Sequence, residues 1–248
     1  VIIISRLLNS CLRFLSLLTV PLKRPGSNRT LLNGDSFQKQ FLKFANSERG
    51  AARLAERTYL PPLLDDHAKL ATLPDGSLGR AYLEFMTREG LTAQGLVDEY
   101  NTSGIDRDYG HDDMEWYGNR LRDTHDLLHV LTGLGRDALG EASVLAYSYA
   151  QHGGPGVVFI AYGAGWEVRK SAPKGAPVMK SISEAKAIGK LADDIVYHDV
   201  MALLEQPLDE VRAMLNIQLP TYYHAVHAKM RDNGIDPYGV IGSTAAAV

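Results

Sequence analysis

Apolar residues recur at helical spacing along most of this chain, and no stretch shows the alternation of a half-buried β-strand. The clearest example is 77–90, where Leu78 and Tyr82 fall on one apolar stripe. Ser77 is a good helix-start residue and Gly90 a good helix-end residue, so both boundaries are marked. The spacing predicts an all-α fold.

The same periodicity predicts further helices in most of the remaining chain. They are expected over 36–46, 48–57, 92–100, 112–132, 138–152, 156–169, 182–204, 207–215 and 220–232. A chain of 248 residues can bury one large core or two small ones. We expect one domain, an irregular helical bundle over 36–232, with an N-terminal segment 1–35 and a C-terminal tail 233–248.

Composition excludes several classes of protein. The formal net charge is -3, which argues against nucleic acid as a partner because phosphates call for a basic face. The single cysteine, Cys11, excludes an internal disulfide and a thiolate metal site. This cysteine usage fits a reducing, cytoplasmic compartment.

Residues 1–20 are rich in Ile, Leu and Val but carry Arg6 and Arg13. Two arginines make this segment a poor membrane span, because a span takes about twenty mostly uncharged residues. The segment is expected either to pack on the core as a first helix or to lie in a membrane interface.

The segment 157–166 reads VVFIAYGAGW and is apolar on every side, so it is predicted to be buried. It is too short to cross a bilayer. Its small residues permit either close helix packing or an open apolar groove for an isoprenoid or acyl tail. Phe159 and Trp166 are the candidate contacts for such a tail.

The strongest chemical signal is a histidine pair followed by a carboxylate. His125 and His129 are four residues apart, so on a helix they share one face and can bind one metal ion. Glu141 lies beyond a glycine-containing turn that can bring it back against the two imidazoles. Asp126 is either a fourth ligand or a group that orients a histidine or accepts a proton. Such ligands suit zinc, and also iron or manganese.

On one ideal helix, Arg122 and Gly118 would share the arc of the histidine pair, about 60° and 20° from His125. Small residues there would leave room for a substrate. Arg122 could pair with Asp126 or receive an anionic group of the substrate. This placement requires 112–132 to be one continuous helix.

Other patterns compete with this interpretation. An HD-type metal phosphohydrolase would use the His125-Asp126 pair together with His111 and Asp199. A zincin-like protease is disfavoured, because Asp126 is one methylene shorter than the glutamate base of that motif. His224 and His227 form a second pair near the C-terminus, but without a nearby carboxylate they are expected to be packing or surface residues.

At these residues the chain resembles a known family. The pattern HDxxH, eleven residues and Glu, within RLRDTHDLLHVLTG and GRDALGE, is similar to the signature of the fourth Coq protein of ubiquinone biosynthesis. Two flanks, 73–82 and 206–217, also resemble it, and the likeness spans about residues 40–218. One departure is that this chain has Asp199-Val200-Met201 where Asp-Trp-Glu is expected.

The resemblance implies an all-α fold with an apolar groove beside a divalent metal, zinc first and iron, manganese or magnesium as alternatives. It makes His125, Asp126, His129 and Glu141 the ligands. The residue pattern itself adds Arg122 and Asp126 as catalytic candidates. The implied reaction is removal of the C1 carboxyl of a polyprenylated 4-hydroxybenzoate-derived precursor, coupled to hydroxylation there. The alternative is a non-catalytic, lipid-binding scaffold.

The resemblance also implies partners and a location. The partners are the polyprenyl precursor, other ubiquinone-biosynthesis proteins and a membrane surface, and a homodimer is left open. The expected location is peripheral on the inner membrane, on the matrix side of mitochondria in a eukaryote.

Overall fold

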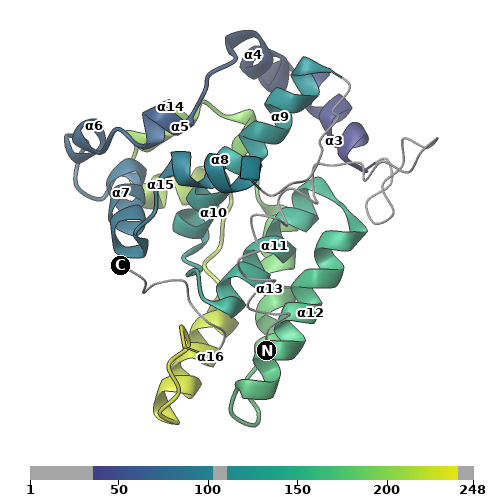
Figure 1. The fold of residues 1–248 in the computed structure, drawn as a ribbon, viewed down its shortest axis with the longest axis vertical. Coiled ribbons are helices and arrows are strands. Elements are labelled where there is room, and N and C mark those ends of the chain that lie inside the picture. Colours follow the sequence, from purple (N-terminus) through teal and green to yellow (C-terminus); the bar gives the residue numbers. More distant parts are fainter. Residues whose placement is uncertain (1–35, 103–110, 240–248) are drawn as a thin grey trace.

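The computed structural model describes residues 36–102 and 111–239 (Figure 1). The interfacial helix predicted within 1–35 lies outside the described residues. Within the described part every regular element is helical, and an isolated bridge between Ser77 and Pro207 is the single β-type pairing there. The all-α prediction is confirmed.

The first half of the described chain forms mostly short helices. They are α3 (Ser36–Ala45), α4 (Glu48–Glu56), α5 (Pro61–Leu64), α6 (His67–Ala71), α7 (Leu78–Glu89), α8 (Ala93–Thr102), α9 (Asp112–Asp123) and α10 (His125–Thr132). In α7 the predicted caps are both present. The Ser77 side chain accepts a hydrogen bond from the Arg80 amide, and Gly90 ends the helix at a φ of 65°.

The second half contains the longer helices. They are α11 (Ala138–His152), α12 (Pro155–Ser171), α13 (Val178–Leu191), the 3-10 turn η1 (Ile195–Tyr197), α14 (Val200–Leu204), α15 (Leu208–Met214) and α16 (Thr221–Asp232). Helices α11, α12 and α13 pack on one another, and α16 packs against α13 (Figure 1). The shorter helices gather over one end of this bundle, with α10 between the two layers. One continuous cluster of buried apolar residues joins both layers.

The helix predicted over 112–132 is interrupted at Thr124, which separates α9 from α10. The Thr124 hydroxyl donates to the carbonyl of Arg120 at 2.9 Å, beside the Thr124 amide at 3.1 Å, and such a shared acceptor often bends a helix. The assumption of one continuous helix was therefore wrong. The positions of Arg122 and Gly118 around the helix axis, which were calculated from His125 on one ideal helix, therefore do not hold.

The helix predicted over 182–204 was also wrong, because the chain leaves the helix after Leu191. Asp193 donates its amide to the Leu215 carbonyl at 2.8 Å, and the Asp194 side chain accepts from the Val196 amide at 3.1 Å. These two bonds replace helical ones and start η1. Helices α5 and α6 fall where no helix was predicted, since four or five residues give too little periodicity to detect.

Helix α12 is buried on one face, not all round as predicted. Val157 and Ala161 face the core, whereas the side chains of Phe159 and Trp166 are 74% and 55% exposed. Apolar composition on every side therefore misled the prediction. Among the described residues, no helix has both the length and the apolar character needed to span a bilayer.

Candidate metal centre

The two histidines of the motif point at each other from successive turns of α10. Their Nε2 atoms are 3.3 Å apart, and both residues are buried. The Nδ1 atom of His129 lies 3.0 Å from the Leu134 carbonyl. A carbonyl only accepts hydrogen bonds, so His129 carries its proton on Nδ1 and turns the Nε2 lone pair toward His125. This is the tautomer that a metal ligand requires.

Glu141 enters the same space from the first turn of α11. One carboxylate oxygen, Oε2, lies 3.6 Å from His125 Nε2 and 3.5 Å from His129 Nε2. The other oxygen, Oε1, accepts from Arg136 Nε at 3.2 Å. Within the described residues Oε2 is buried without a hydrogen-bond partner. A buried anionic oxygen left in this way is costly unless a cation sits beside it.

The pKa shifts of Glu141 and His129 also indicate that the Glu141 carboxylate is stabilised by positive charge beside it. Burial by itself raises the pKa of Glu141, but the neighbouring His129 and His125 outweigh it and hold that pKa well below its ordinary value. Burial lowers the pKa of His129, but Glu141 raises it by more. Without a metal, a proton shared with His129 supplies the positive charge that the carboxylate needs.

The spacing of the three atoms fits a small tetrahedral ion. Zinc–nitrogen bonds are about 2.0–2.1 Å long, and tetrahedral donors then lie about 3.3–3.4 Å apart. The observed separations are 3.3, 3.5 and 3.6 Å. A ligand atom of Asp126 lies within 4.8 Å of ligand atoms of both histidines, so His125, Asp126 and His129 form a candidate metal-binding cluster. The residues present therefore fit a bound divalent metal.

Arg122 is a buried residue of α9, and its contacts lie on α9 itself and on α8. Its guanidinium pairs with Asp123 at 2.7 Å, donates to the Asn119 side chain at 3.0 Å and lies over the Tyr100 ring at 5.0 Å. The sequence had offered a pair with Asp126, and the neighbouring carboxylate takes that place. Burial raises the pKa of Asp123 to about 6, even though Arg122 acts in the opposite direction.

The C-terminal end of α10 is held by a distant arginine. Arg212 of α15 donates from Nε to the Leu131 carbonyl at 3.0 Å and from Nη2 to the Val130 carbonyl at 3.1 Å. These carbonyls are two of those that a helix end leaves without partners. Gly133 then reverses the chain at a φ of 69°, a conformation that favours glycine.

A second cluster fastens the start of α11. The Asp137 side chain accepts from the amides of Leu139 and Gly140, forms a short hydrogen bond with the Tyr223 hydroxyl, and lies 3.1 Å from His227 Nε2. Tyr223 also accepts from the Gly135 amide at 3.0 Å. We call Asp137, Tyr223 and His227 the Asp137 cluster. It ties α16 to the turn whose Leu134 carbonyl orients His129.

The sequence missed the Asp137 cluster. His227 was expected to be a packing or surface residue because no carboxylate lies near it in the chain, yet its partner Asp137 is 90 positions away. The cap at Asp137 was readable from the sequence, since aspartate before a helix is a strong start signal. Nothing local indicated Tyr223.

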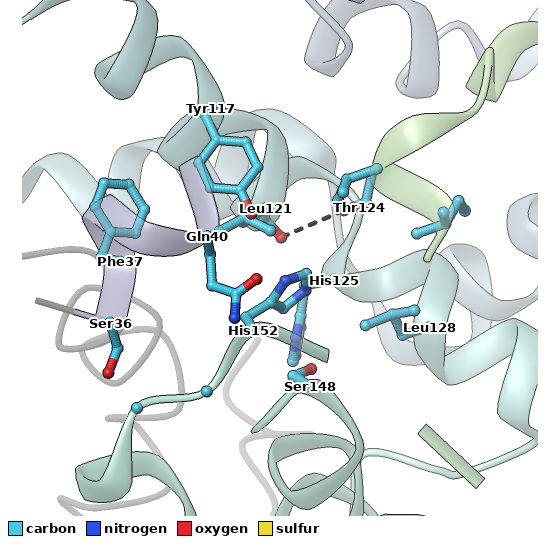
Figure 2. A pocket seen from close by; sticks show the side chains of 14 residues that line it. Ser36, Phe37, Gln40, Tyr117, Leu121, Thr124, His125, Leu128, Ser148 and His152 are labelled. Carbon is cyan, nitrogen blue, oxygen red and sulfur yellow. Dashed lines mark hydrogen bonds between the residues drawn. The ribbon is translucent and has the colours of Figure 1, made fainter. Parts of the chain in front are cut away.

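A narrow cavity lies on the His125 side of the centre, between α3, α9 and α11 (Figure 2). Its free volume is about 20 Å³, enough for a single water molecule. Figure 2 shows Gln40 of α3 and His152 of α11 on the walls that surround His125. His152 Nδ1 lies 3.4 Å from an Asp194 carboxylate oxygen.

The remaining predicted residues lie away from the cluster. His111 and Asp199 cap the starts of α9 and α14, where each accepts hydrogen bonds from backbone amides. The phosphohydrolase alternative needed both at the metal, so the structure argues against it. Phe159 and Trp166 lie on the exposed face of α12. The tail 233–239 is described, and its Tyr238 ring faces His227.

Comparison with known proteins gives consistent matches. A family model described as "Coenzyme Q (ubiquinone) biosynthesis protein Coq4" matches residues 34–221. The chain is 28% identical over 189 residues to the zebrafish (Danio rerio) protein named "Ubiquinone biosynthesis protein COQ4 homolog, mitochondrial", covering 72% of this chain and 63% of the relative. It is 32% identical over 113 residues to the human protein of the same name, covering 46% of this chain and 40% of the relative. The matches thus span less than two thirds of these relatives.

A solved structure supports the fold. A crystal structure of a candidate ubiquinone biosynthesis protein from Nostoc punctiforme superposes with a TM-score of 0.56 and 21% identity. The match covers 73% of this chain and 81% of that one. At this identity the likeness shows a shared fold.

Proposed function

Because the chain belongs to the coenzyme Q (ubiquinone) biosynthesis protein Coq4 family, we propose that it acts in ubiquinone biosynthesis as a metal-dependent decarboxylase. The substrate is a polyprenylated 4-hydroxybenzoate-derived precursor. It loses its C1 carboxyl as carbon dioxide, in a step coupled to hydroxylation at the same carbon. Zinc is the expected metal, held by His125, His129 and Glu141 with Asp126 as fourth ligand or base.

One observation supports this proposal most directly. Glu141 Oε2 is buried without a hydrogen-bond partner among the described residues, 3.5–3.6 Å from two imidazole nitrogens. A histidine pair with a carboxylate is a usual catalytic zinc set, which leaves one position for a substrate oxygen. A bound divalent cation would supply a Lewis acid that stabilises negative charge on the substrate.

The chain's own residues supply the rest of the chemistry. When the C1–carboxyl bond breaks, its electron pair stays on the ring, so groups that hold positive charge near the ring lower the barrier. Asp126 is 7% exposed and can take or return a proton at the edge of the site. Zinc has no redox chemistry, so the coupled hydroxylation requires dioxygen as a two-electron oxidant: dioxygen leaves as hydrogen peroxide, and water supplies the oxygen of the new ring hydroxyl.

We propose the same substrate contacts as the sequence predicted: an anionic group at Arg122, and an isoprenoid tail at Phe159 and Trp166. Arg122 is engaged by Asp123, so a substrate carboxylate must share its guanidinium. Phe159 and Trp166 are exposed, so they can contact an isoprenoid tail only along the outer face of α12.

The proposed partners are the polyprenyl precursor, other ubiquinone-biosynthesis proteins and a membrane surface. The names of the zebrafish and human relatives place those proteins in mitochondria. By analogy we propose a peripheral position on the inner membrane, on the matrix side.

The test joins metal content to the reaction. Purified full-length protein and its Glu141→Gln variant, which keeps the side-chain shape, are compared by elemental analysis. Glu205→Gln is the matched control, because Glu205 is exposed at the end of α14. We expect about one metal per wild-type or control chain and strong loss in Glu141→Gln. Equal metal content in all three proteins would contradict the proposed ligand set.

The second arm separates an enzyme from a scaffold. Metal-loaded protein is given a carboxylated polyprenyl precursor with dioxygen and membranes, and the lipid products are analysed. Formation of the decarboxylated, hydroxylated ring by wild type and Glu205→Gln, but not by Glu141→Gln, supports the enzyme. Absence of product with all three proteins favours the lipid-binding scaffold.

A further inference from the structure

We propose that a second cavity, on the His129 side of the metal centre, binds the aromatic carboxylate head of the substrate. This α16 cavity lies between α7, the turn after α10, and α16. Its walls include Ala81, Phe85, Arg88, His129, Tyr223 and Arg231. The inference rests on the proposed function, because that function supplies the benzoate-type substrate.

Volume separates this cavity from the narrow one. The α16 cavity has a free volume of about 390 Å³, against about 20 Å³ on the His125 side. A dry cavity of about 150 Å³ already holds benzene, and ligand pockets usually exceed about 300 Å³. A substituted benzoate ring therefore fits in the α16 cavity and is too large for the narrow one.

The walls suit an aromatic ring close to the metal centre. The Phe85 and His129 rings are stacked, with centroids 5.6 Å apart and planes 19° apart. Tyr223 adds a second aromatic wall from α16. Because His129 itself lines the cavity, a ring bound there lies next to a metal ligand without crossing the core.

The charges around the cavity favour an anion. Arg88 and Arg231 line it, against the single carboxylate of Glu84. Glu89 occupies the Nε atom of Arg88 at 3.0 Å. The Arg231 guanidinium has no ion pair with any other described residue, so it is available for an anionic oxygen of the ligand.

His227 also lines the cavity and is 4% exposed, but its Nε2 atom faces Asp137 at 3.1 Å. The cavity therefore offers aromatic walls and a cationic rim, which matches a hydroxybenzoate.

The probe is 4-hydroxybenzoate, the soluble head of the proposed substrate, titrated into the full-length protein with and without zinc. Binding is followed by calorimetry and by methyl NMR shifts of Leu208 and Val130, which line the cavity. Ala81→Trp places an indole in the cavity, and Ala51→Trp on the exposed face of α4 is its control. Arg231→Gln removes a rim charge, with exposed Arg169→Gln on α12 as control.

We expect the two controls to bind like wild type. Ala81→Trp should weaken binding at least about 10-fold, and Arg231→Gln about 2–5-fold, as an exposed charge allows. Unchanged binding by Ala81→Trp, no binding by the wild type, or shifts confined to other residues would each overturn the inference.

The two proposals can fail separately. If Ala81→Trp abolishes hydroxybenzoate binding but the protein forms no decarboxylated product, the proposed binding site is supported and the proposed enzyme activity is contradicted. If Ala81→Trp and Ala51→Trp form equal amounts of product, the proposed enzyme activity is supported and the proposed binding site is contradicted.

Discussion

The Tyr223 hydroxyl makes a sharp test of how the metal centre is held. It donates to the Asp137 carboxylate and accepts from the Gly135 amide at 3.0 Å, so Tyr223→Phe removes two buried hydrogen bonds. The ring stays in place, tilted at 46° to the His227 ring with centroids 4.2 Å apart, so no cavity is created. Burial and the Asp137 carboxylate raise the pKa of Tyr223 far above its ordinary value, and the group is a neutral phenol at any working pH.

The magnitude follows from these contacts. A hydrogen bond to a charged group contributes about 1.5–3 kcal/mol, and a stranded buried amide costs about 1–3 kcal/mol. Asp137 keeps its bonds to two α11 amides and its pair with His227, so the loss lies toward the lower end. We expect the free energy of unfolding to fall by about 2–4 kcal/mol. Thermal unfolding should then occur about 4–16 °C lower, at roughly 2–4 °C per kcal/mol for a chain of this size.

Urea unfolding of the metal-free protein measures this loss directly, and Tyr222→Phe is the control. Tyr222 is adjacent in α16 and 38% exposed, and its hydroxyl makes no hydrogen bond to another described residue. Zinc affinity is a second readout, because the Gly135 turn carries the Leu134 carbonyl that orients His129. We expect zinc to bind about 3–10-fold more weakly, below the 10–100-fold typical of direct outer-shell partners. Equal stability of the two variants, within about 0.5 kcal/mol, would refute this account of the Asp137 cluster.

A metal present at a free concentration of about 1,000 times its dissociation constant should stabilise the protein by about 4 kcal/mol. Removing it with a chelator should therefore lower the temperature of thermal unfolding by about 8–16 °C. An unchanged unfolding curve would show that no structural metal was bound. The difference in the free energy of unfolding between metal-loaded and chelated protein should decrease as pH falls. Burial lowers the pKa of His129 but Glu141 raises it by more, so protonated His129 stabilises the metal-free protein fully below its unfolded pKa, and this contribution is lost as pH rises. A difference that increases on acidification, measured by calorimetry, would contradict this sign. Gly140→Ala should destabilise the fold by several kcal/mol, since its Cβ would fall on the Gly135 carbonyl oxygen, whereas Gly163→Ala, with open space around it, should stabilise by about 0.5–1 kcal/mol; denaturant midpoints compare the two.

Local signals explain which parts of the fold were predictable. Helix α7 was read correctly because Ser77 and Gly90 mark its ends and its stripe lies on the core. The break at Thr124 was not, because a bond from a threonine hydroxyl to the carbonyl four residues earlier bends some helices and leaves others continuous. The exposed face of α12 was missed for a related reason. Its apolar composition does not say which side the neighbouring helices cover, and they leave Phe159 and Trp166 uncovered.

In the candidate metal centre, nearby residues determine which side chains meet, and residues distant in the chain determine how they are held. Helical spacing alone brings His125 and His129 together, and a glycine turn with an aspartate cap brings Glu141 to them. The sequence could therefore predict the three atoms. It could not predict what fixes their separation, since Arg212 and Tyr223 act on the ends of this turn from 80 or more positions away in the chain.

The turn between α10 and α11 must hold the metal donors within a few tenths of an ångström. A turn containing Gly133 and Gly135 is by itself too flexible in its backbone angles to do that. Arg212 fixes the last carbonyls of α10, and Tyr223 fixes the first residues before α11, so the turn is clamped on both sides. Helices α15 and α16 thus act on the candidate metal centre without supplying one of its proposed ligands. The HDxxH motif specifies which atoms meet, and these two later helices specify how closely they meet.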